Sequence, residues 1–214
     1  MFKVRIKFSK EDELRFISHL DLTRTWERLA RRAELPLLLS QGFSPRPKMA
    51  FGPPLPLGYI SKTELIEIAL TERMGLKEIY KRLAEQLPQG LRISKIEVLT
   101  EEMPALSAIE TVSYYVITRS DELEDEIQER VKEFLLKKEV WIKRESPKGE
   151  KMINLRAGVF DLKFKKEGEE IRWEMLLSVG SQGTVRPEEV IKALGGQGVE
   201  LYLVDIQRQE LYFE

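Results

Sequence analysis

Cationic side chains recur in two neighbouring stretches near the N-terminus, and their types suit the binding of phosphate groups. Residues 24–32 carry them at helical spacing, and residues 40–48 combine cations with an aromatic ring and a proline-stiffened backbone. Arginine can bond a phosphate through two N–H groups, and an aromatic ring can stack on an unpaired base. The alternatives are a solvated helix face and a proline-rich crossover whose Phe43 packs into the core. We predict one RNA-binding surface made by Arg24, Arg28, Arg31, Arg32, Gln41, Phe43, Arg46 and Lys48.

His19 is the one histidine of the chain and the one candidate for catalysis. A helix that begins after Ser18 would place its ring in the first turn, where the helix dipole lowers an imidazole pKa and favours the neutral form. A neutral histidine could act as general base on a 2′-hydroxyl and cut RNA without a metal. A packing or hydrogen-bonding role is the alternative, and it is the commoner role for a lone histidine.

The absence of cysteine excludes several classes of chemistry. The chain cannot form a disulfide, a cysteine-ligated zinc site or an iron–sulfur cluster from its own thiolates. A single histidine excludes a multi-histidine metal site, and neither an EF-hand loop nor a Walker A motif is present. Carboxylate-only binding of Mg²⁺ or Ca²⁺ stays open. We therefore expect no cofactor and no metal site, and most enzyme classes are disfavoured.

The composition is that of an ordered chain with an uneven distribution of charge. Of 214 residues, 42% are hydrophobic and 33% charged, which favours folding over disorder. Residues 1–48 contain 11 basic and 6 acidic side chains, whereas the whole chain has a net charge of −1. A polyanion is therefore expected to meet the N-terminal half, unless the two halves neutralise each other. No apolar stretch suits a membrane span or a secretion signal, so we expect a cytoplasmic location and no membrane partner.

The elements that must position these residues follow from the hydrophobic pattern. Residues 2–8 alternate as a half-buried strand, and apolar residues repeat at helical spacing from Leu22 until Pro36. A short strand at 37–40, a strand at 63–71, a helix at 76–87 and a strand at 91–100 follow. This order is βαββαβ, the ferredoxin-like arrangement, with the helices on one face of an antiparallel sheet. Glu67 should then lie beside Arg5 on the other face, and the two are expected to form an ion pair.

The C-terminal half predicts a second domain of the same kind. Strands are expected at 111–119, 140–145, 159–166, 171–179 and 200–213, with helices at 121–138 and 187–194 and an extra strand or loop at 146–158. Apart from that insertion the order repeats the first half. We therefore predict an α+β protein of two tandem ferredoxin-like domains with antiparallel sheets, a basic one at residues 1–103 and an acidic one at 110–214.

Four motifs carry a resemblance to a known family. They are RFISHLDL at residues 15–22, RRAELP at 31–36, SQGFSPRPK at 40–48 and PLG at 56–58. Together they resemble the radical-SAM-linked family of bacterial proteins, a domain of unknown function that stands alone or extends cobalamin-binding radical-SAM proteins. The resemblance implies a separately encoded radical-SAM protein as partner, and it implies no mechanism. Because a radical-SAM cluster needs cysteine ligands, this chain cannot be the catalytic half.

The sequence leaves three functions open. The first is a non-catalytic accessory module that acts with a radical-SAM protein and binds RNA or a ribonucleoprotein substrate. The second is a metal-independent endoribonuclease based on His19. The chain is loosely similar to CRISPR repeat-processing endoribonucleases, which also join two ferredoxin-like domains and commonly use histidine. The third is a pure protein-docking subunit, for which exposed aromatic side chains would serve as anchors: Trp26, Phe43, Trp141 or Trp173.

Overall fold

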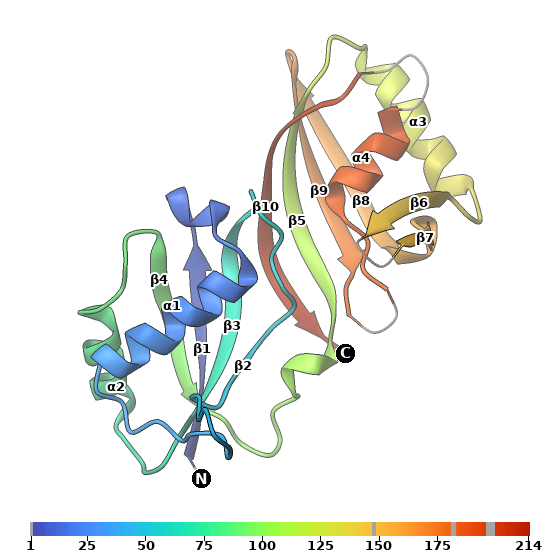
Figure 1. Cartoon of the computed structure of the whole chain (residues 1–214). Helices are drawn as coiled ribbons and strands as arrows, with labels where there is room; N and C mark the ends of the chain where they lie inside the picture. The colour runs from blue at the N-terminus through green and yellow to red at the C-terminus, as the bar shows by residue number, and fades with distance from the viewer. Residues whose placement is uncertain (1, 147–148, 181–182, 196–199) are drawn as a thin grey trace. The chain divides into compact units, whose positions relative to one another are not determined.

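The computed structural model describes residues 2–146, 149–180, 183–195 and 200–214, and the chain divides into two compact units, Met1–Ala108 and Ile109–Glu214 (Figure 1). The fold is mixed α+β, with antiparallel strands and, in the described residues, four α-helices. No helix in the described part of the chain has the length and apolar character needed to cross a membrane.

Unit 1 places two helices against an antiparallel sheet. The strand order is β4-β1-β3, and β2 pairs with β3. Two 3₁₀ turns, Asp12–Phe16 and Leu106–Ala108, complete the unit. Its regular elements are β1 (Phe2–Lys10), α1 (His19–Arg32), β2 (Met49–Phe51), β3 (Ile60–Leu70), α2 (Leu76–Ala84) and β4 (Leu91–Val98).

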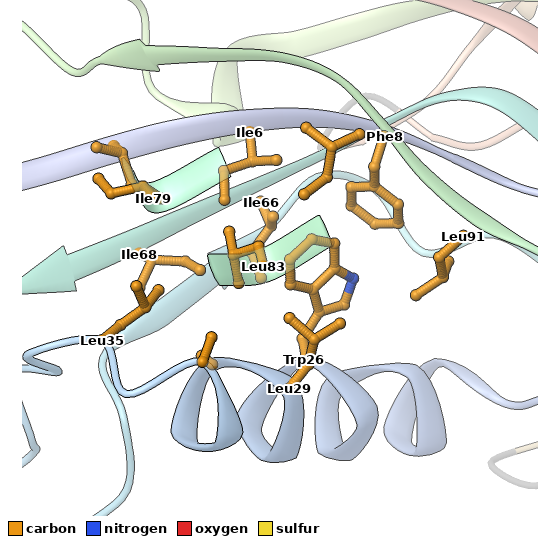
Figure 2. Close-up of a cluster of buried hydrophobic side chains, with 14 of the residues drawn as sticks. Ile6, Phe8, Trp26, Leu29, Leu35, Ile66, Ile68, Ile79, Leu83 and Leu91 are labelled. Carbon is orange, nitrogen blue, oxygen red and sulfur yellow. The ribbon is translucent and has the colours of Figure 1, made fainter. Parts of the chain in front are cut away.

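The alternation of β1 decides which face of this sheet is buried. Val4, Ile6 and Phe8 are fully buried beneath α1 and α2, as predicted from the period of two. Figure 2 shows Trp26 of α1 beside Phe8 in this core, and the two ring centroids lie 4.8 Å apart. Burial of such large apolar side chains contributes about 1.5–3 kcal/mol each. The opposite face, which neither helix covers, is called the open face below.

Helix α1 begins where the sequence predicts. The Ser18 hydroxyl oxygen accepts a hydrogen bond of 3.1 Å from the Asp21 backbone N–H, so it satisfies one of the free donors of the first turn. The same hydroxyl donates to the Asp21 carboxylate over 2.6 Å. Leu22, Trp26 and Leu29 then fall on the buried face. This cap marks the residue at which the helix begins.

The second strand of unit 1 differs from the prediction. Residues 37–40 form only isolated bridges, and the strand that pairs with β3 is β2 at Met49–Phe51. The Ser40 N–H donates to the Arg46 carbonyl and the Lys48 N–H donates to the Leu38 carbonyl, both over 2.8 Å. Residues 38–48 therefore fold back on themselves, because prolines that lack an N–H interrupt a regular ladder.

Unit 2 has the strand order β10-β5-β9-β8, with every neighbouring pair antiparallel, and a separate β6–β7 hairpin. The strand predicted at 140–145 is β6, which pairs with β7 and not with the larger sheet, and β7 lies in the region 146–158 where an extra strand or loop was predicted. Helix α3 (Glu124–Leu136) is shorter at both ends than the helix predicted at 121–138, whereas α4 (Pro187–Gly195) lies where a helix was predicted at 187–194. The elements are β5 (Ile109–Arg119), α3 (Glu124–Leu136), β6 (Trp141–Ser146), β7 (Gly149–Asn154), a 3₁₀ turn (Arg156–Gly158), β8 (Val159–Glu167), β9 (Glu170–Ser178), α4 (Pro187–Gly195) and β10 (Tyr202–Phe213).

Candidate functional site

The open face of unit 1 is organised around a buried ion pair. Arg5 and Glu67 are register partners on β1 and β3, and Arg5 Nη2 lies 2.5 Å from Glu67 Oε1. The Arg5 Nε donates to the same oxygen over 3.1 Å. Their side chains are only 4% and 14% exposed. The predicted ion pair is confirmed, so the charge of Arg5 is neutralised within the sheet.

Three other cations surround a hollow on this face. Lys3 of β1, Arg46 and Lys48 line a space of about 370 Å³ together with Ser40, Ala50 and Ala69. In the described residues, no hydrogen bond or ion pair engages the side chain of any of the three cations. Glu67 also lines the hollow, but Arg5 balances its charge. This group, named the cationic hollow, therefore carries an uncompensated positive charge suited to an anion.

The backbone holds the two loop cations in place. Ser40 bonds Arg46 twice, because its N–H donates to the Arg46 carbonyl and its hydroxyl accepts from the Arg46 N–H over 3.1 Å. The Lys48 carbonyl accepts from the Ala69 N–H of β3 over 3.0 Å. A loop tied to a strand in this way loses little conformational freedom when a ligand binds.

Phe43 and Gln41 lie at the exposed tip of this loop. The Phe43 ring is fully exposed, so the alternative that it packs into the core is wrong. Gly42, beside it, has φ of +124°, a conformation that favours glycine. An exposed aromatic ring next to cations is suited to stacking on an unpaired base.

The arginines of α1 form a separate row. Arg24 lies 3.5 Å from the Asp21 carboxylate, and Arg32 Nη2 donates weakly to the Gln86 carbonyl over 3.5 Å. Arg28 and Arg31 are exposed, and their side chains have no partner among the residues that the structure describes. Because α1 covers the face of the sheet opposite the cationic hollow, the single surface expected from the sequence is split in two.

His19 is half-buried rather than presented to solvent. Its ring packs edge-on against Phe51, with centroids 5.5 Å apart. Burial lowers the pKa of His19 below its ordinary value of 6.5; Glu64 opposes this shift and Lys10 adds to it. The neutral form was predicted, but its main cause is burial and not the helix dipole.

Sequence reasoning missed the buried charges beside His19. Lys10 at the end of β1 is 1% exposed and Glu64 of β3 is 5% exposed. The Lys10 ammonium donates to the Ile17 carbonyl over 3.3 Å. Strand alternation could have indicated their burial. Lys10 is two residues from Phe8 and Glu64 is two residues from Ile66, and Phe8 and Ile66 both lie on the core face.

Two of the motifs described in the sequence analysis are bonded to each other. The Arg15 Nε donates to the Gly58 carbonyl over 2.7 Å, and the Gly58 N–H donates to the Arg15 carbonyl over 2.9 Å. The first motif, residues 15–22, is thus tied to the PLG motif at 56–58. These contacts give the motifs a role in holding the fold.

The tryptophans differ in their value as docking anchors. Trp26 and Trp173 are buried in the cores of their units, so neither can meet a partner. Trp141 on β6 is more than half exposed.

No group of three or more histidine, cysteine, aspartate or glutamate side chains suited to a metal ion occurs within the described ranges.

Comparison with solved structures finds a similar fold in a protein complex and in two ribonucleoproteins. A chain of the crystal structure of a Cbf5–Nop10–Gar1 complex superposes with a TM-score of 0.59 at 12% identity, and it covers 97% of this chain. A chain of an H/ACA RNP bound to a substrate RNA containing 2′-deoxyuridine gives 0.56 at 13% identity over 97% of this chain. An archaeal box H/ACA sRNP Nop10–Cbf5 complex gives 0.53 at 12% identity, again over 97%. At these identities the likeness shows the fold alone.

The present chain spans about half the length of those structures, 48%, 47% and 47% of each. A comparison with curated proteins found no match. The model of one family fits residues 3–187, which include all of unit 1 except its first two residues and most of unit 2. The chain therefore belongs to the family described as uncharacterized proteins conserved in bacteria, DUF2344.

Proposed function

We propose that this chain is a non-catalytic module that binds single-stranded RNA, alone or within a ribonucleoprotein, on the open face of unit 1. One observation carries the proposal: Lys3, Arg46 and Lys48 converge from two segments on one hollow, and no other described side chain neutralises them. Phosphate groups supply the negative charge that such a hollow lacks, and release of their counterions drives binding.

The neighbouring residues extend the proposed interface. Phe43 would stack on an unpaired base beside the cationic hollow, and Gln41 would add hydrogen bonds. The α1 row, Arg24, Arg28, Arg31 and Arg32, would contact phosphates only of an RNA long enough to pass around the edge of the unit. Two of the similar structures, an H/ACA RNP bound to a substrate RNA and an archaeal box H/ACA sRNP complex, are named as ribonucleoproteins, which supports RNA as the class of ligand.

The partner in the proposal is a separately encoded radical-SAM protein. It rests on the motifs at residues 15–22, 31–36, 40–48 and 56–58, and on the absence of cysteine ligands in this chain. In this arrangement the present chain holds the RNA and the partner supplies the chemistry. Co-purification of the two proteins tests this part, and its failure leaves RNA binding by the chain untouched.

We interpret both units as ferredoxin-like βαββαβ domains. The strand orders β4-β1-β3-β2 and β10-β5-β9-β8, each antiparallel, support this interpretation, with the β6–β7 hairpin as an insertion in the second. The proposed domains at residues 1–103 and 110–214 leave a connector between them.

Binding of a labelled single-stranded RNA by the full chain tests the RNA proposal. The triple variant Lys3→Ala/Arg46→Ala/Lys48→Ala should weaken binding at least about tenfold at low salt, because it removes three phosphate contacts. Lys77→Ala/Lys81→Ala is the matched control, since both lysines are exposed on α2 and lie outside the cationic hollow. Arg28→Ala/Arg31→Ala measures the α1 row separately. Equal losses in the triple variant and the α2 control would refute the assignment.

A further inference from the structure

The segment at residues 99–105, named the arch segment, lies across part of the open face and is fastened to β1 at two points. The Leu99 N–H donates to the Lys3 carbonyl over 2.9 Å. Arg5 Nη2 donates to the Pro104 carbonyl over 2.5 Å, while its other bonds hold Glu67. The arch segment is thus positioned by the same arginine that joins β1 to β3.

A second hollow, of about 410 Å³, lies between the arch segment and the sheet. Lys3 and Glu67 line both hollows, so the two meet along this pair of residues. Each volume falls within the range of about 300–1,000 Å³ that is typical of ligand sites. The second hollow is lined by Lys3, Arg5, Glu67, Leu99, Thr100, Glu101, Met103 and Ala105.

Beyond Lys3 and Glu67, which it shares with the first hollow, the second hollow has groups that the first lacks. Leu99, Met103 and Ala105 present apolar surface, and Thr100 and Glu101 add a hydroxyl and a carboxylate. The Glu101 side chain makes no hydrogen bond or ion pair with any described residue. A phosphate would be repelled from this carboxylate, whereas an apolar ring with an N–H donor at its edge matches it.

We propose that the hollow under the arch segment takes one unpaired nucleobase that carries an exocyclic amino group. The phosphate of that nucleotide lies in the cationic hollow, and the base lies between Leu99 and Met103. Glu101 accepts the hydrogen bond of the amino group, which cytosine, adenine and guanine have and uracil lacks. This inference rests on the proposed RNA binding and adds base selection to it.

The test compares short oligocytidylate and oligouridylate of equal length, each bound to the full chain and followed by fluorescence anisotropy at fixed salt. Oligocytidylate should bind about tenfold more tightly, the size expected of one hydrogen bond to a charged acceptor. Glu101→Gln should bring the ratio close to one, because the amide can also donate to a uracil carbonyl. Glu102→Gln is the matched control, since Glu102 has the same charge, is exposed and does not line the hollow.

The outcomes separate the two proposals. Tight, salt-dependent binding with equal affinity for both oligomers overturns base selection and leaves RNA binding in place. An equal loss of preference in Glu101→Gln and Glu102→Gln overturns the role of Glu101. Absence of binding to either oligomer overturns the proposed function, and base selection with it. A ratio that falls in Glu101→Gln alone supports the inference.

Discussion

Arg5 and Glu67 face each other across β1 and β3 in an ion pair of 2.5 Å that is almost completely removed from water. The same guanidinium reaches the Pro104 carbonyl, so it joins two strands and the arch segment. This relationship links the stability of unit 1 to the shape of its open face. Because Arg5 neutralises Glu67, the Glu67 carboxylate does not neutralise the positive charge of the cationic hollow.

Loss of Glu67 should destabilise the protein strongly. In Glu67→Ala the buried Arg5 loses its ion-pair partner on β3, which costs about 3 kcal/mol in the free energy of unfolding. Denaturant titration monitored by circular dichroism measures the change. Lys95→Met is the control, because Lys95 and Glu97 form an exposed pair on the same sheet and its loss costs at most about 1 kcal/mol. Equal effects in the two variants would contradict the account.

The helix cap at Ser18 gives a second stability prediction. Ser18→Ala removes the acceptor of the Asp21 N–H and should lower the free energy of unfolding by about 1 kcal/mol. Ser18→Asn restores an acceptor and should recover most of the loss. Thermal unfolding of the three proteins makes the comparison, and an asparagine variant as unstable as the alanine variant would show that the cap is unimportant.

His19 should titrate below 6.5, because burial disfavours its charged form. The unfolded chain then binds the proton more tightly than the folded one. The stability contributed by neutral His19 is therefore complete above pH 6.5 and is lost as the pH falls through the lower, folded-state pKa. As the one histidine in the chain, its ring protons give a single NMR titration curve. A folded-state pKa above 6.5 would contradict this reading.

The endoribonuclease alternative is tested by incubation of structured RNA with the protein in EDTA. A general base must reach the 2′-hydroxyl, and the His19 ring instead packs against Phe51 in a half-buried position. We expect intact RNA with both the unchanged protein and His19→Ala. Cleavage by the unchanged protein that disappears in His19→Ala would restore the enzymatic hypothesis.

Local patterns in the sequence predicted much of the fold of unit 1. The alternation of β1 and the Ser18 cap are local, and the Arg5–Glu67 pair followed once β3 was placed beside β1. The cationic hollow was not predictable in the same way. It depends on the path of residues 38–48, which brings Arg46 to the face that Lys3 occupies, and no periodicity encodes that path.

Other misses had different causes. Lys10 and Glu64 lie on the core face at positions that the strand alternation allows, but charged residues are so seldom buried that composition favours the opposite expectation. The exposure of Phe43 depends on the path of the loop around it, where Gly42 has a positive φ that the sequence permits and does not require. The arch segment depends on the non-local bond from Arg5 to Pro104.

The dependence of RNA affinity on salt tests the central claim most directly. For single strands, the slope of log affinity against log salt is about −0.7 for each phosphate neutralised. If Lys3, Arg46 and Lys48 each meet one phosphate, the triple alanine variant should have a slope shallower than that of the unchanged protein by about 2. A slope that is the same in both proteins would contradict RNA binding at the cationic hollow.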